Sequence, residues 1–369
     1  MTDPDRAQLT VLHVSQPGDG GVASCVRDLV RDQVGRGWRV FVAGDPGSEL
    51  AAATEIAGAE LLGWQATRSP GASVAAETGQ LARIIRSADP DLVHLHSSKA
   101  GLAGRLALRG RLPTVFQPHS WSFEAVGGVV RRAAIAWERL GARWAHAILC
   151  VSNGERERGV DQGIRGRFTV IPNGVDLVAF PPANHAARLA ARSRLALGEE
   201  PIVVCTGRLC HQKGQDRLVE AWPAVRARVN GATLILVGAG EDEQVLRERA
   251  ADGVRLAGHR VDIADWLAAA DVVAVPSRWE GMALGLLEAM ATGRSVVATD
   301  VGGAREALEG GAGAVVPAND GTAFVDALVQ RLVTPELREA EGATAIRKAR
   351  AAYDVQTTLD RTAALYQGL

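Results

Sequence analysis

Short apolar runs that do not alternate with polar residues recur along this chain, and amphipathic segments separate them. In the first half the runs are LTVLHVS, WRVFVAG, DLVHLHS, PTVFQPH and AHAILCVS. In the second half they are PIVVCTG, ATLILVG, GVRLAG, DVVAVPS, SVVATD and AGAVVP. Runs of about four to eight such residues are typical of parallel strands that are buried on both faces. Because helical segments such as CVRDLVRDQVGRG lie between them, the pattern predicts α/β architecture with doubly wound parallel sheets.

The chain is long for one domain, at 369 residues, so two domains are expected. Prolines and an Asn-Gly pair interrupt both periodicities between the two series of runs, which places the crossing near residues 173–185. We therefore expect an N-terminal domain at residues 1–180 and a C-terminal domain at 181–353. A final helix at about 354–369 is expected to pack back on the first domain.

Composition excludes several classes of protein. A net charge of −1 gives no basic excess for nucleic acid, and no block of like charge indicates a disordered tail. The four cysteines show no CxxC spacing, which favours a reducing compartment. The polar start MTDPDRAQLT does not resemble a signal peptide, and no run of about eighteen apolar residues is present. These features predict a soluble cytoplasmic protein with a small or uncharged partner.

Glycines and cations follow the predicted strands, where ligands bind in sheets of this type. Gly18, Gly20 and Gly21 lie in a turn that opens into a helix, which favours an anion; an ordinary tight turn is the alternative. Arg208 and Lys213 follow PIVVCTG in the segment RLCHQKG. Two cations at the end of a strand can neutralise a diphosphate, although solvated surface cations would give the same sequence pattern.

Two glutamates stand eight residues apart in SRWEGMALGLLEAMATG. If the intervening segment is helical, Glu280 and Glu288 could lie up to roughly 12 Å apart, too far to share a proton. Free amides near Met282 to Gly285 would bind an anion between them. A ligand with hydroxyl groups on both sides of a diphosphate fits this arrangement, as in a nucleoside diphosphate sugar. The alternative is a carboxylate at a helix start and an exposed helical glutamate.

These motifs together carry a resemblance to a known family. GRLCHQKG, LILVGAGED, VIPNGVD and the segment VRLAGHRVDIADWLAAADVVAVPSRWEGMALGLLEAMATGRSVVATDVGG resemble the retaining GT-B glycosyltransferases of family 4, also called the group 1 family. DLVHLHSSKAGLAGRLA and TVFQPHSW add a weaker N-terminal signature. The resemblance covers most of the second half closely and the first half in outline. It implies a GT-B fold, in which two Rossmann-like domains face each other across a cleft.

The resemblance also implies roles for individual residues. Glu280 would bind hydroxyls of the donor sugar, and Glu288 would bind the ribose hydroxyls. Arg208 and Lys213 match the diphosphate-binding pair of the family. His119, which follows TVFQP, matches a histidine that reaches the donor sugar near the reaction centre. The residues expected to be catalytic are therefore His119, Arg208, Lys213 and Glu280.

Further donor contacts are implied by backbone positions. Gly20 and Gly21 match a loop that closes over the diphosphate, and the loop of Gly258, His259 and Arg260 matches one that contacts the base. The remaining donor-binding positions expected here are Met282, Ala283 and Leu284. Many family members have Phe-Gly where this chain has Met-Ala, so phosphate binding by amides is retained while the choice of sugar is left open.

The function implied is a retaining transfer of a hexose, with a UDP sugar favoured, to a hydroxyl acceptor. No metal or other cofactor is implied, because the two cations and the helix amides already supply positive charge. The leaving diphosphate would help to take the proton of the acceptor in a front-face mechanism. A nucleotide-sugar epimerase on the same fold and a non-catalytic binding protein are the alternatives.

The acceptor is expected on the N-terminal domain, with His96, Lys99 and Trp121 as candidate contacts. Arg131 and Arg132, with nearby aromatic residues, would suit a lipid-linked acceptor at the inner face of a membrane. The alternative for this segment is an amphipathic helix packed on the sheet, and a small-molecule acceptor is equally open.

Three other motifs have competing interpretations. Gly238 and Gly240 in LVGAGEDE have dinucleotide-fingerprint spacing, but the acidic residues that follow would repel a pyrophosphate. Asp89-Pro90-Asp91 has the spelling of a metal-binding DxD, yet it precedes a strand, so a turn is favoured. His94 and His96 share a strand face without a third ligand nearby in sequence, which favours packing over zinc.

Overall fold

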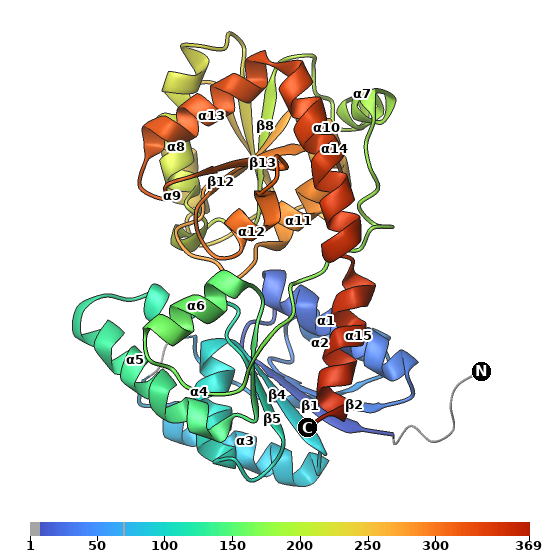
Figure 1. Cartoon of the computed structure of the whole chain (residues 1–369), viewed down its shortest axis with the longest axis vertical. Coiled ribbons are helices and arrows are strands. Elements are labelled where there is room, and N and C mark those ends of the chain that lie inside the picture. Colours follow the sequence, from blue (N-terminus) through green and yellow to red (C-terminus); the bar gives the residue numbers. More distant parts are fainter. Residues whose placement is uncertain (1–7, 69–70) are drawn as a thin grey trace. The chain divides into compact units, whose positions relative to one another are not determined.

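The protein divides into two compact units, which are described separately (Figure 1). The structure is a computed structural model that describes residues 8–68 and 71–369. Unit 1 contains the described residues up to Ile171 together with Leu359–Leu369, and unit 2 contains Pro172–Thr358. The last helix, α15 (Val355–Gln367), thus contributes its residues from Leu359 onward to unit 1.

Unit 1 is built on a seven-stranded parallel sheet with the order β3-β2-β1-β4-β5-β6-β7. Its strands are β1 (Thr10–Ser15), β2 (Arg39–Gly44), β3 (Glu60–Gly63), β4 (Leu92–His96), β5 (Thr114–Gln117), β6 (Ala147–Cys150) and β7 (Phe168–Val170). Every residue of β4 is buried, as expected for a central strand with helices on both faces. The strand order changes direction between β1 and β4, so the loops after these strands diverge and leave room for a ligand.

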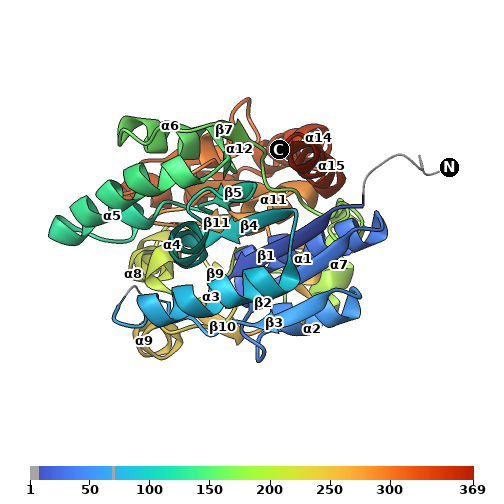
Figure 2. The ribbon, with the colours of Figure 1, turned by 90° about the horizontal axis from the view of Figure 1, so that it is seen from below.

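Helices cover both faces of this sheet (Figure 2). They are α1 (Gly20–Gly35), α2 (Glu49–Ile56), α3 (Val74–Ala88), α4 (Ser97–Leu108), α5 (Gly128–Gly141) and α6 (Asn153–Asp161). One core cluster joins Val11 of β1 to Val26 of α1 and Tyr366 of α15. A second cluster joins Leu12 of β1 to Leu81 of α3 and Ala103 of α4. Neighbouring residues of β1 therefore enter opposite core layers, in accordance with the strand period of two.

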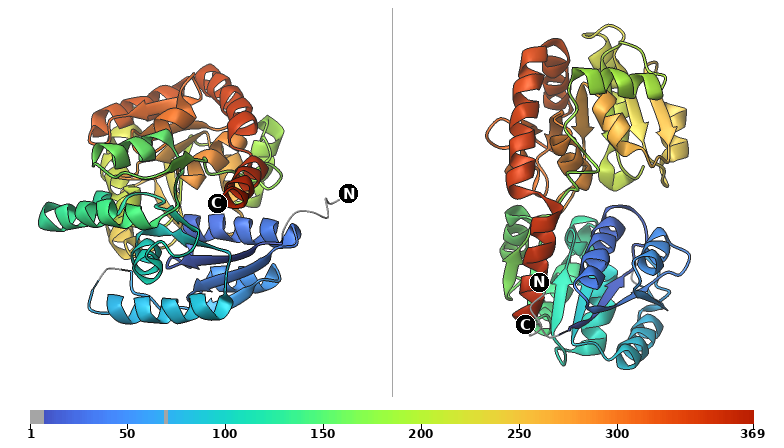
Figure 3. Two further views of the ribbon diagram at one scale, coloured as in Figure 1. Left: turned by 60° about the horizontal axis from the view of Figure 1, so that its bottom comes forward. Right: turned by 90° about the vertical axis from the view of Figure 1, so that its right-hand side faces the viewer.

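Unit 2 contains a six-stranded parallel sheet with the order β10-β9-β8-β11-β12-β13. Helices flank this sheet (Figure 3). Its strands are β8 (Ile202–Thr206), β9 (Thr233–Val237), β10 (Val254–Gly258), β11 (Val272–Val275), β12 (Ser295–Thr299) and β13 (Gly313–Val316). Its helices are α7 (His185–Arg194), α8 (Gln215–Arg226), α9 (Glu243–Arg249), α10 (Ile263–Ala269), α11 (Leu284–Ala291), α12 (Ala304–Leu308), α13 (Gly321–Val333) and α14 (Pro335–Ala352). The strand order changes direction between β8 and β11.

Each apolar run quoted from the sequence contains a strand, and the prediction of two doubly wound parallel sheets is confirmed. Strands β3 and β7 were not predicted. Both lie at the edges of the sheet of unit 1, are three or four residues long, and are only partly buried, so neither produces an apolar run. Among the described residues, no helix has both the length and the apolar character needed to cross a membrane.

Candidate active site

In unit 2, the loops after β8 and β11 meet because these strands are neighbours in the sheet. Lys213, in the loop after β8, places its Nζ 2.6 Å from Oε1 of Glu280, which follows β11. The hydroxyl of Ser277 donates to the same carboxylate oxygen at 3.0 Å. The structure therefore joins a cation and a carboxylate that are 67 residues apart in the sequence at one edge of the sheet.

The charge of Lys213 depends on this contact. Burial by itself would lower the pKa of the lysine, but attraction to Glu280 and the hydrogen bond to it outweigh burial and raise the pKa. Lys213 is therefore a fixed cation at physiological pH. A second anion, such as a phosphate, would meet a lysine that is already oriented by a carboxylate.

Close backbone packing fixes the two loops against each other. A Cβ added to Gly214, whose φ is +70°, would lie 2.1 Å from the carbonyl oxygen of Pro276, so only glycine fits there. The guanidinium of Arg278 donates to both carboxylate oxygens of Asp216, at 2.7 and 2.6 Å. Such a forked contact holds the segment before Glu280 to the start of α8.

Arg208 follows β8 and has a 35 % exposed side chain, which lies 3.7 Å from the carboxylate of Glu241. The glycines of LVGAG support its loop. A Cβ on Gly238 would lie 2.1 Å from the carbonyl oxygen of Gly207, and one on Gly240 would lie 2.3 Å from that of Leu209. These glycines thus allow the backbone to approach the Arg208 loop, which accounts for their spacing without a dinucleotide.

Helix α11 begins with Ala283 as its N-cap and Leu284 as its first residue. The side chains of Met282 and Ala283 are buried, so what this turn offers to a ligand is mainly backbone. Asn173 donates from its side-chain amide to the carbonyl oxygen of Met282 at 2.9 Å. Glu288 lies on α11 and is partly buried, which agrees with its apolar neighbours in the sequence.

Two further residues of unit 2 hold this turn and were missed from the sequence. Gly302 has a φ of +58°, and a Cβ there would lie 2.6 Å from the carbonyl oxygen of Glu280. Thr299 donates from its hydroxyl to the carbonyl oxygen of Ser277 at 2.6 Å. Gly302 and Gly303, shortly after the run SVVATD, could have indicated this contact, because paired glycines in a loop after a strand allow a close backbone approach.

The loop after β10 contains the three residues expected to contact a base. Gly258 ends the strand with a φ of +72°, and His259 and Arg260 are exposed. The guanidinium of Arg260 donates to both carboxylate oxygens of Asp262, at 2.9 and 2.6 Å, and lies over the ring of Trp266. The side chain of Arg260 is thus held by its own loop.

Unit 1 holds the other expected site residues. Gly20 and Gly21 are exposed at the start of α1, and the φ of Gly20 is +73°. No heavy atom lies within 4 Å of a Cβ built on Gly20, so its backbone conformation and not crowding favours glycine there. His119, after β5, also has a left-handed backbone, with a φ of +55°, and is partly exposed.

A group of buried histidines lies next to His119. His13 of β1 is paired in register with His94 of β4, and both are fully buried, as is His96. No third potential ligand lies near His94 and His96 in the sequence, but the pairing of β1 with β4 brings His13 next to them. Ring nitrogens of these three histidines lie within 4.8 Å of one another. His96 Nδ1 in turn lies 3.2 Å from Nε2 of His119.

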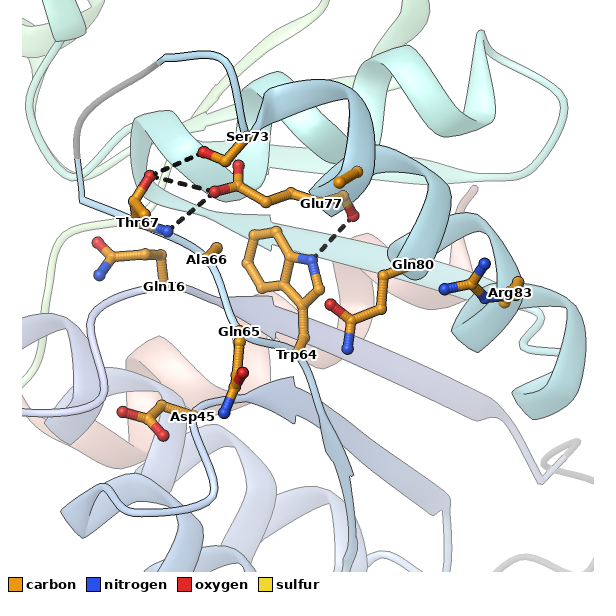
Figure 4. A pocket seen from close by; sticks show the side chains of 11 residues that line it. Gln16, Asp45, Trp64, Gln65, Ala66, Thr67, Ser73, Glu77, Gln80 and Arg83 are labelled. Carbon is orange, nitrogen blue, oxygen red and sulfur yellow. Dashed lines mark hydrogen bonds between the residues drawn. The ribbon is translucent and has the colours of Figure 1, made fainter.

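A pocket of about 570 Å³ opens in unit 1 near the ends of β1, β2 and β3 (Figure 4). Five of its eleven lining residues are polar and uncharged, and three more are charged. The lining residues are Gln16, Asp45, Trp64, Gln65, Ala66, Thr67, Ser73, Ala76, Glu77, Gln80 and Arg83. Amide and hydroxyl groups of this kind pair with ligand hydroxyls in either direction.

The wall of this pocket is held by Glu77. Its Oε1 accepts hydrogen bonds from the backbone amide of Thr67 at 2.9 Å and from the hydroxyl of Thr67 at 3.1 Å. Its Oε2 lies 2.7 Å from Nζ of the buried Lys99. Burial alone would raise the pKa of Glu77, but the hydrogen bonds from Lys99 and Thr67 outweigh it and lower that pKa to about 2.

The three residues expected to contact an acceptor are all buried. Lys99 lies behind the pocket wall, where it also donates to the hydroxyl of Thr67 at 3.3 Å. Trp121 stacks on Phe123 and donates to the carbonyl oxygen of Glu155 at 2.7 Å. His96 belongs to the histidine group. Asp89-Pro90-Asp91 forms the turn before β4, where Asp91 accepts from the amide of Thr10 at 2.7 Å.

Comparisons with known proteins identify the family. The family model described as "Glycosyltransferase Family 4" matches residues 19–179, and the model described as "Glycosyl transferases group 1" matches residues 200–333. A GDP-mannose-dependent monoacylated alpha-(1-6)-phosphatidylinositol monomannoside mannosyltransferase of Corynebacterium glutamicum is 29% identical over 354 residues, which are 92% of each chain. A GDP-mannose-dependent alpha-(1-6)-phosphatidylinositol monomannoside mannosyltransferase of Mycobacterium tuberculosis is 39% identical over 188 residues, which are 47% of this chain and 49% of that one.

Solved structures resemble the whole chain. Anabaena HepE in complex with UDP-glucose has a TM-score of 0.84 at 23% identity and matches 98% of this chain and 100% of that one. WaaG, a glycosyltransferase involved in lipopolysaccharide biosynthesis, has a TM-score of 0.77 at 18% identity and matches 97% of this chain and 100% of that one. Two family models that together cover most of both units, and two parallel α/β sheets of the GT-B type, show that the chain belongs to the group 1 glycosyltransferases.

Proposed function

We propose that this glycosyltransferase moves a hexosyl group from a nucleoside diphosphate sugar to a hydroxyl acceptor, with retention of configuration and without a metal ion. The observation that carries this proposal is the contact between Lys213 and Glu280, at 2.6 Å, beside the first turn of α11. This contact supports the proposal because a cation that would bind the diphosphate and a carboxylate that would bind sugar hydroxyls lie together at an edge of the sheet where ligands bind.

The donor would bind along the strand ends of unit 2. Lys213, Arg208 and the amides at the start of α11 would neutralise the diphosphate, which gains charge as the bond to the sugar breaks. Glu280 would accept hydrogen bonds from sugar hydroxyls, and Glu288 from those of the ribose. Gly258, His259 and Arg260 would contact the base, and Gly20 and Gly21 would approach the diphosphate.

The reaction follows from these contacts. The bond between the anomeric carbon and the leaving phosphate oxygen breaks, and a bond to the acceptor oxygen forms on the same face of the sugar. The proton of the acceptor hydroxyl passes to an oxygen of the leaving diphosphate. Lys213 and Arg208 hold the charge on that diphosphate, and His119 orients the sugar. Positive charge is thus supplied by side chains and amides, so activity should persist in EDTA.

The base and sugar of the donor are the finer part of the proposal. The family resemblance favours a UDP sugar, while the mannosyltransferase relatives are named for GDP-mannose. Thermal-shift measurements with UDP, GDP and ADP test which base binds. Hydrolysis assays with the corresponding hexose derivatives then test which sugar is used. Stabilisation by GDP and turnover of GDP-mannose alone would replace the UDP assignment.

The acceptor would bind in the pocket of unit 1, whose amide and hydroxyl lining suits a polyhydroxylated group. A lipid-linked acceptor is favoured by the start of α5, where Val129 and Val130 are 77% and 62% exposed beside the exposed Arg131 and Arg132. Apolar and basic side chains on one helix end are typical of contact with an anionic membrane. Flotation with anionic vesicles, with Val129→Ser and Arg132→Ser as variants, tests this part.

A nucleotide-sugar epimerase is the competing function on this fold. Incubation with a donor that binds, in the absence of acceptor, separates the two reactions. Slow release of free sugar and nucleoside diphosphate agrees with a transferase that uses water as a poor acceptor. Accumulation of an isomerised sugar nucleotide would contradict the proposed transfer.

A further inference from the structure

A continuous chain of hydrogen bonds runs through the interior of unit 1 to His119. Oε1 of Gln33, on α1, lies 2.8 Å from Nε2 of His13 on β1. Nδ1 of His13 lies 2.9 Å from Nε2 of His96 on β4, and Nδ1 of His96 lies 3.2 Å from Nε2 of His119. Gln33, His13 and His96 are at most 1% exposed, whereas His119 is partly exposed.

The three histidines of this hydrogen-bonded series, His13, His96 and His119, are neutral at physiological pH. Burial lowers the pKa of His13 to about 4 and that of His119 to about 3. Burial, together with the neighbouring histidines, also lowers the pKa of His96. A neutral imidazole has one nitrogen that donates and one that accepts. The direction of each hydrogen bond along the chain is therefore set by the direction of the one before it.

The amide oxygen of Gln33 sets the direction of the first hydrogen bond, because an amide oxygen accepts hydrogen bonds and cannot donate them. Nε2 of His13 must then carry the proton, which leaves Nδ1 of His13 to accept from Nε2 of His96. Nδ1 of His96 then accepts from Nε2 of His119. The amide oxygen of Gln33 thus determines, through the two intervening side chains His13 and His96, which nitrogen of His119 is protonated.

We propose that Gln33, His13 and His96 are positioning residues that hold His119 in the tautomer protonated on Nε2, so that Nδ1 is a hydrogen-bond acceptor. His119 then accepts a hydrogen bond from a hydroxyl of the transferred sugar and does not donate one. That His119 contacts a sugar rests on the proposed function, whereas the assignment of its tautomer does not.

The backbone of His119 supports a positioning role for this chain. His119 and Ser120 have φ values of +55° and +124°, in a region that is unfavourable for residues other than glycine. Such conformations persist where the surroundings hold them. The contact with His96 fixes the imidazole at the end of this strained turn.

A metal ion bound by His13, His94 and His96 is the competing interpretation. Both ring nitrogens of His13 and both of His96 already have partners in the chain of hydrogen bonds. The three ligands would also be neutral and fully buried, with no carboxylate in the group to offset a double positive charge. The observations therefore favour a network of hydrogen bonds, and metal binding is an outcome of the test.

The tautomer can be measured without any assay of activity. Nitrogen-15 histidine spectra of the full-length protein at neutral pH should show His119 protonated on Nε2 and unprotonated on Nδ1. His119→Asn identifies the signal. In Gln33→Met and His96→Phe, which remove an acceptor at two points of the chain, the His119 signals should move toward a mixture of tautomers. Thr54→Val, which removes a buried hydroxyl outside the chain of hydrogen bonds, should leave them unchanged.

The wild-type spectrum can overturn the proposal even if Gln33→Met or His96→Phe fails to fold, because protonation of His119 on Nδ1 would contradict it. If both variants fold, an unchanged His119 tautomer in both would also overturn it. About one equivalent of tightly bound zinc after dialysis would also overturn it, in favour of a metal site.

Whether His119 accepts or donates the hydrogen bond to the sugar is tested with deoxy and deoxyfluoro forms of a sugar nucleotide that binds. The informative hydroxyl is the one whose removal weakens binding in the wild type but not in His119→Ala. Because fluorine does not donate a hydrogen bond, the deoxyfluoro form should lose about as much affinity as the deoxy form. Retained affinity of the deoxyfluoro form would show that His119 donates. If no sugar nucleotide binds at all, the proposed function fails while the tautomer measurement still stands.

Discussion

The two units have the same parallel architecture but carry different polar groups on their central strands and in the loops that follow them. In unit 1, uncharged histidines from β1 and β4 meet in the interior, with His13, His94 and His96 fully buried. In unit 2, the loops after β8 and β11 bring together the charged pair Lys213 and Glu280. Its described histidines, His185, His211 and His259, are exposed. One scaffold can therefore present either neutral or ionic groups, according to which side chains the neighbouring central strands bring together.

The largest expected difference between the units is their response to acid. Burial lowers the pKa of His13 to about 4 and lowers those of His94 and His96 too, so the unfolded chain binds more protons than the folded chain below about pH 6.5. The stabilisation is full above that pH and is lost as pH falls toward 4. Three such groups give a slope of about 4 kcal/mol per pH unit at most.

Pulsed hydrogen exchange at one fixed pH, after incubation across pH 7 to 4, would measure this. Peptides from β1 and β4 should lose protection before peptides from β8 and β11. Equal loss in both units, or earlier loss in unit 2, would break the comparison.

The next largest effect is expected from the last helix. Tyr366 is 3% exposed and packs with Trp38 and β1, and its hydroxyl contacts Nδ1 of His94. Tyr366→Ala should therefore destabilise unit 1 by about 3–5 kcal/mol, as for other large buried aromatic residues. Exposed Gln367→Ala is the matched control and should be nearly neutral. Urea unfolding followed by hydrogen exchange would show whether the loss begins in unit 1, as the comparison requires.

Lys213→Ala should reduce turnover about a hundredfold to a thousandfold, because the lysine would stabilise charge that grows on the leaving diphosphate. Lys348→Ala is the control in the same unit, since Lys348 donates to the backbone carbonyl oxygens of Glu306 and Glu309. Steady-state kinetics with the donor identified by the binding panel gives both values. Turnover near that of the wild type in Lys213→Ala would place the diphosphate elsewhere.

The smallest effects concern the two glutamates, at about 1.5–3 kcal/mol each, which is tenfold to a hundredfold. Glu288→Ala should weaken binding of the bare nucleoside diphosphate, because ribose contacts are lost. Glu280→Ala should leave that affinity intact or raise it, since Lys213 loses its carboxylate, yet it should strongly reduce transfer. Calorimetry with the bare nucleotide separates the two variants. Equal weakening in both would mean that Glu280 acts through local electrostatics and not through the sugar.

Much of the fold follows from patterns that are local in the sequence. Each predicted apolar run contains a strand, because a strand buried on both faces requires consecutive apolar residues. The edge strands β3 and β7 escaped prediction because half-exposed strands of three or four residues need no such run. The loop glycines were recognisable as well, and Gly238 and Gly240 show why spacing alone does not identify their partner. They approach the Arg208 loop of the protein itself.

Local patterns in the sequence identify the residues that follow each strand, and this is enough to predict that Lys213 and Glu280 lie at one edge of a sheet. Their ion pair could not be predicted in this way, because it depends on β8 and β11 being neighbours in the folded sheet. The same holds for His13 and His96, which are 83 residues apart and meet through the register of β1 with β4. Periodicity reports how one segment is buried, whereas strand order and register fix which distant side chains share a face, and no local pattern encodes them.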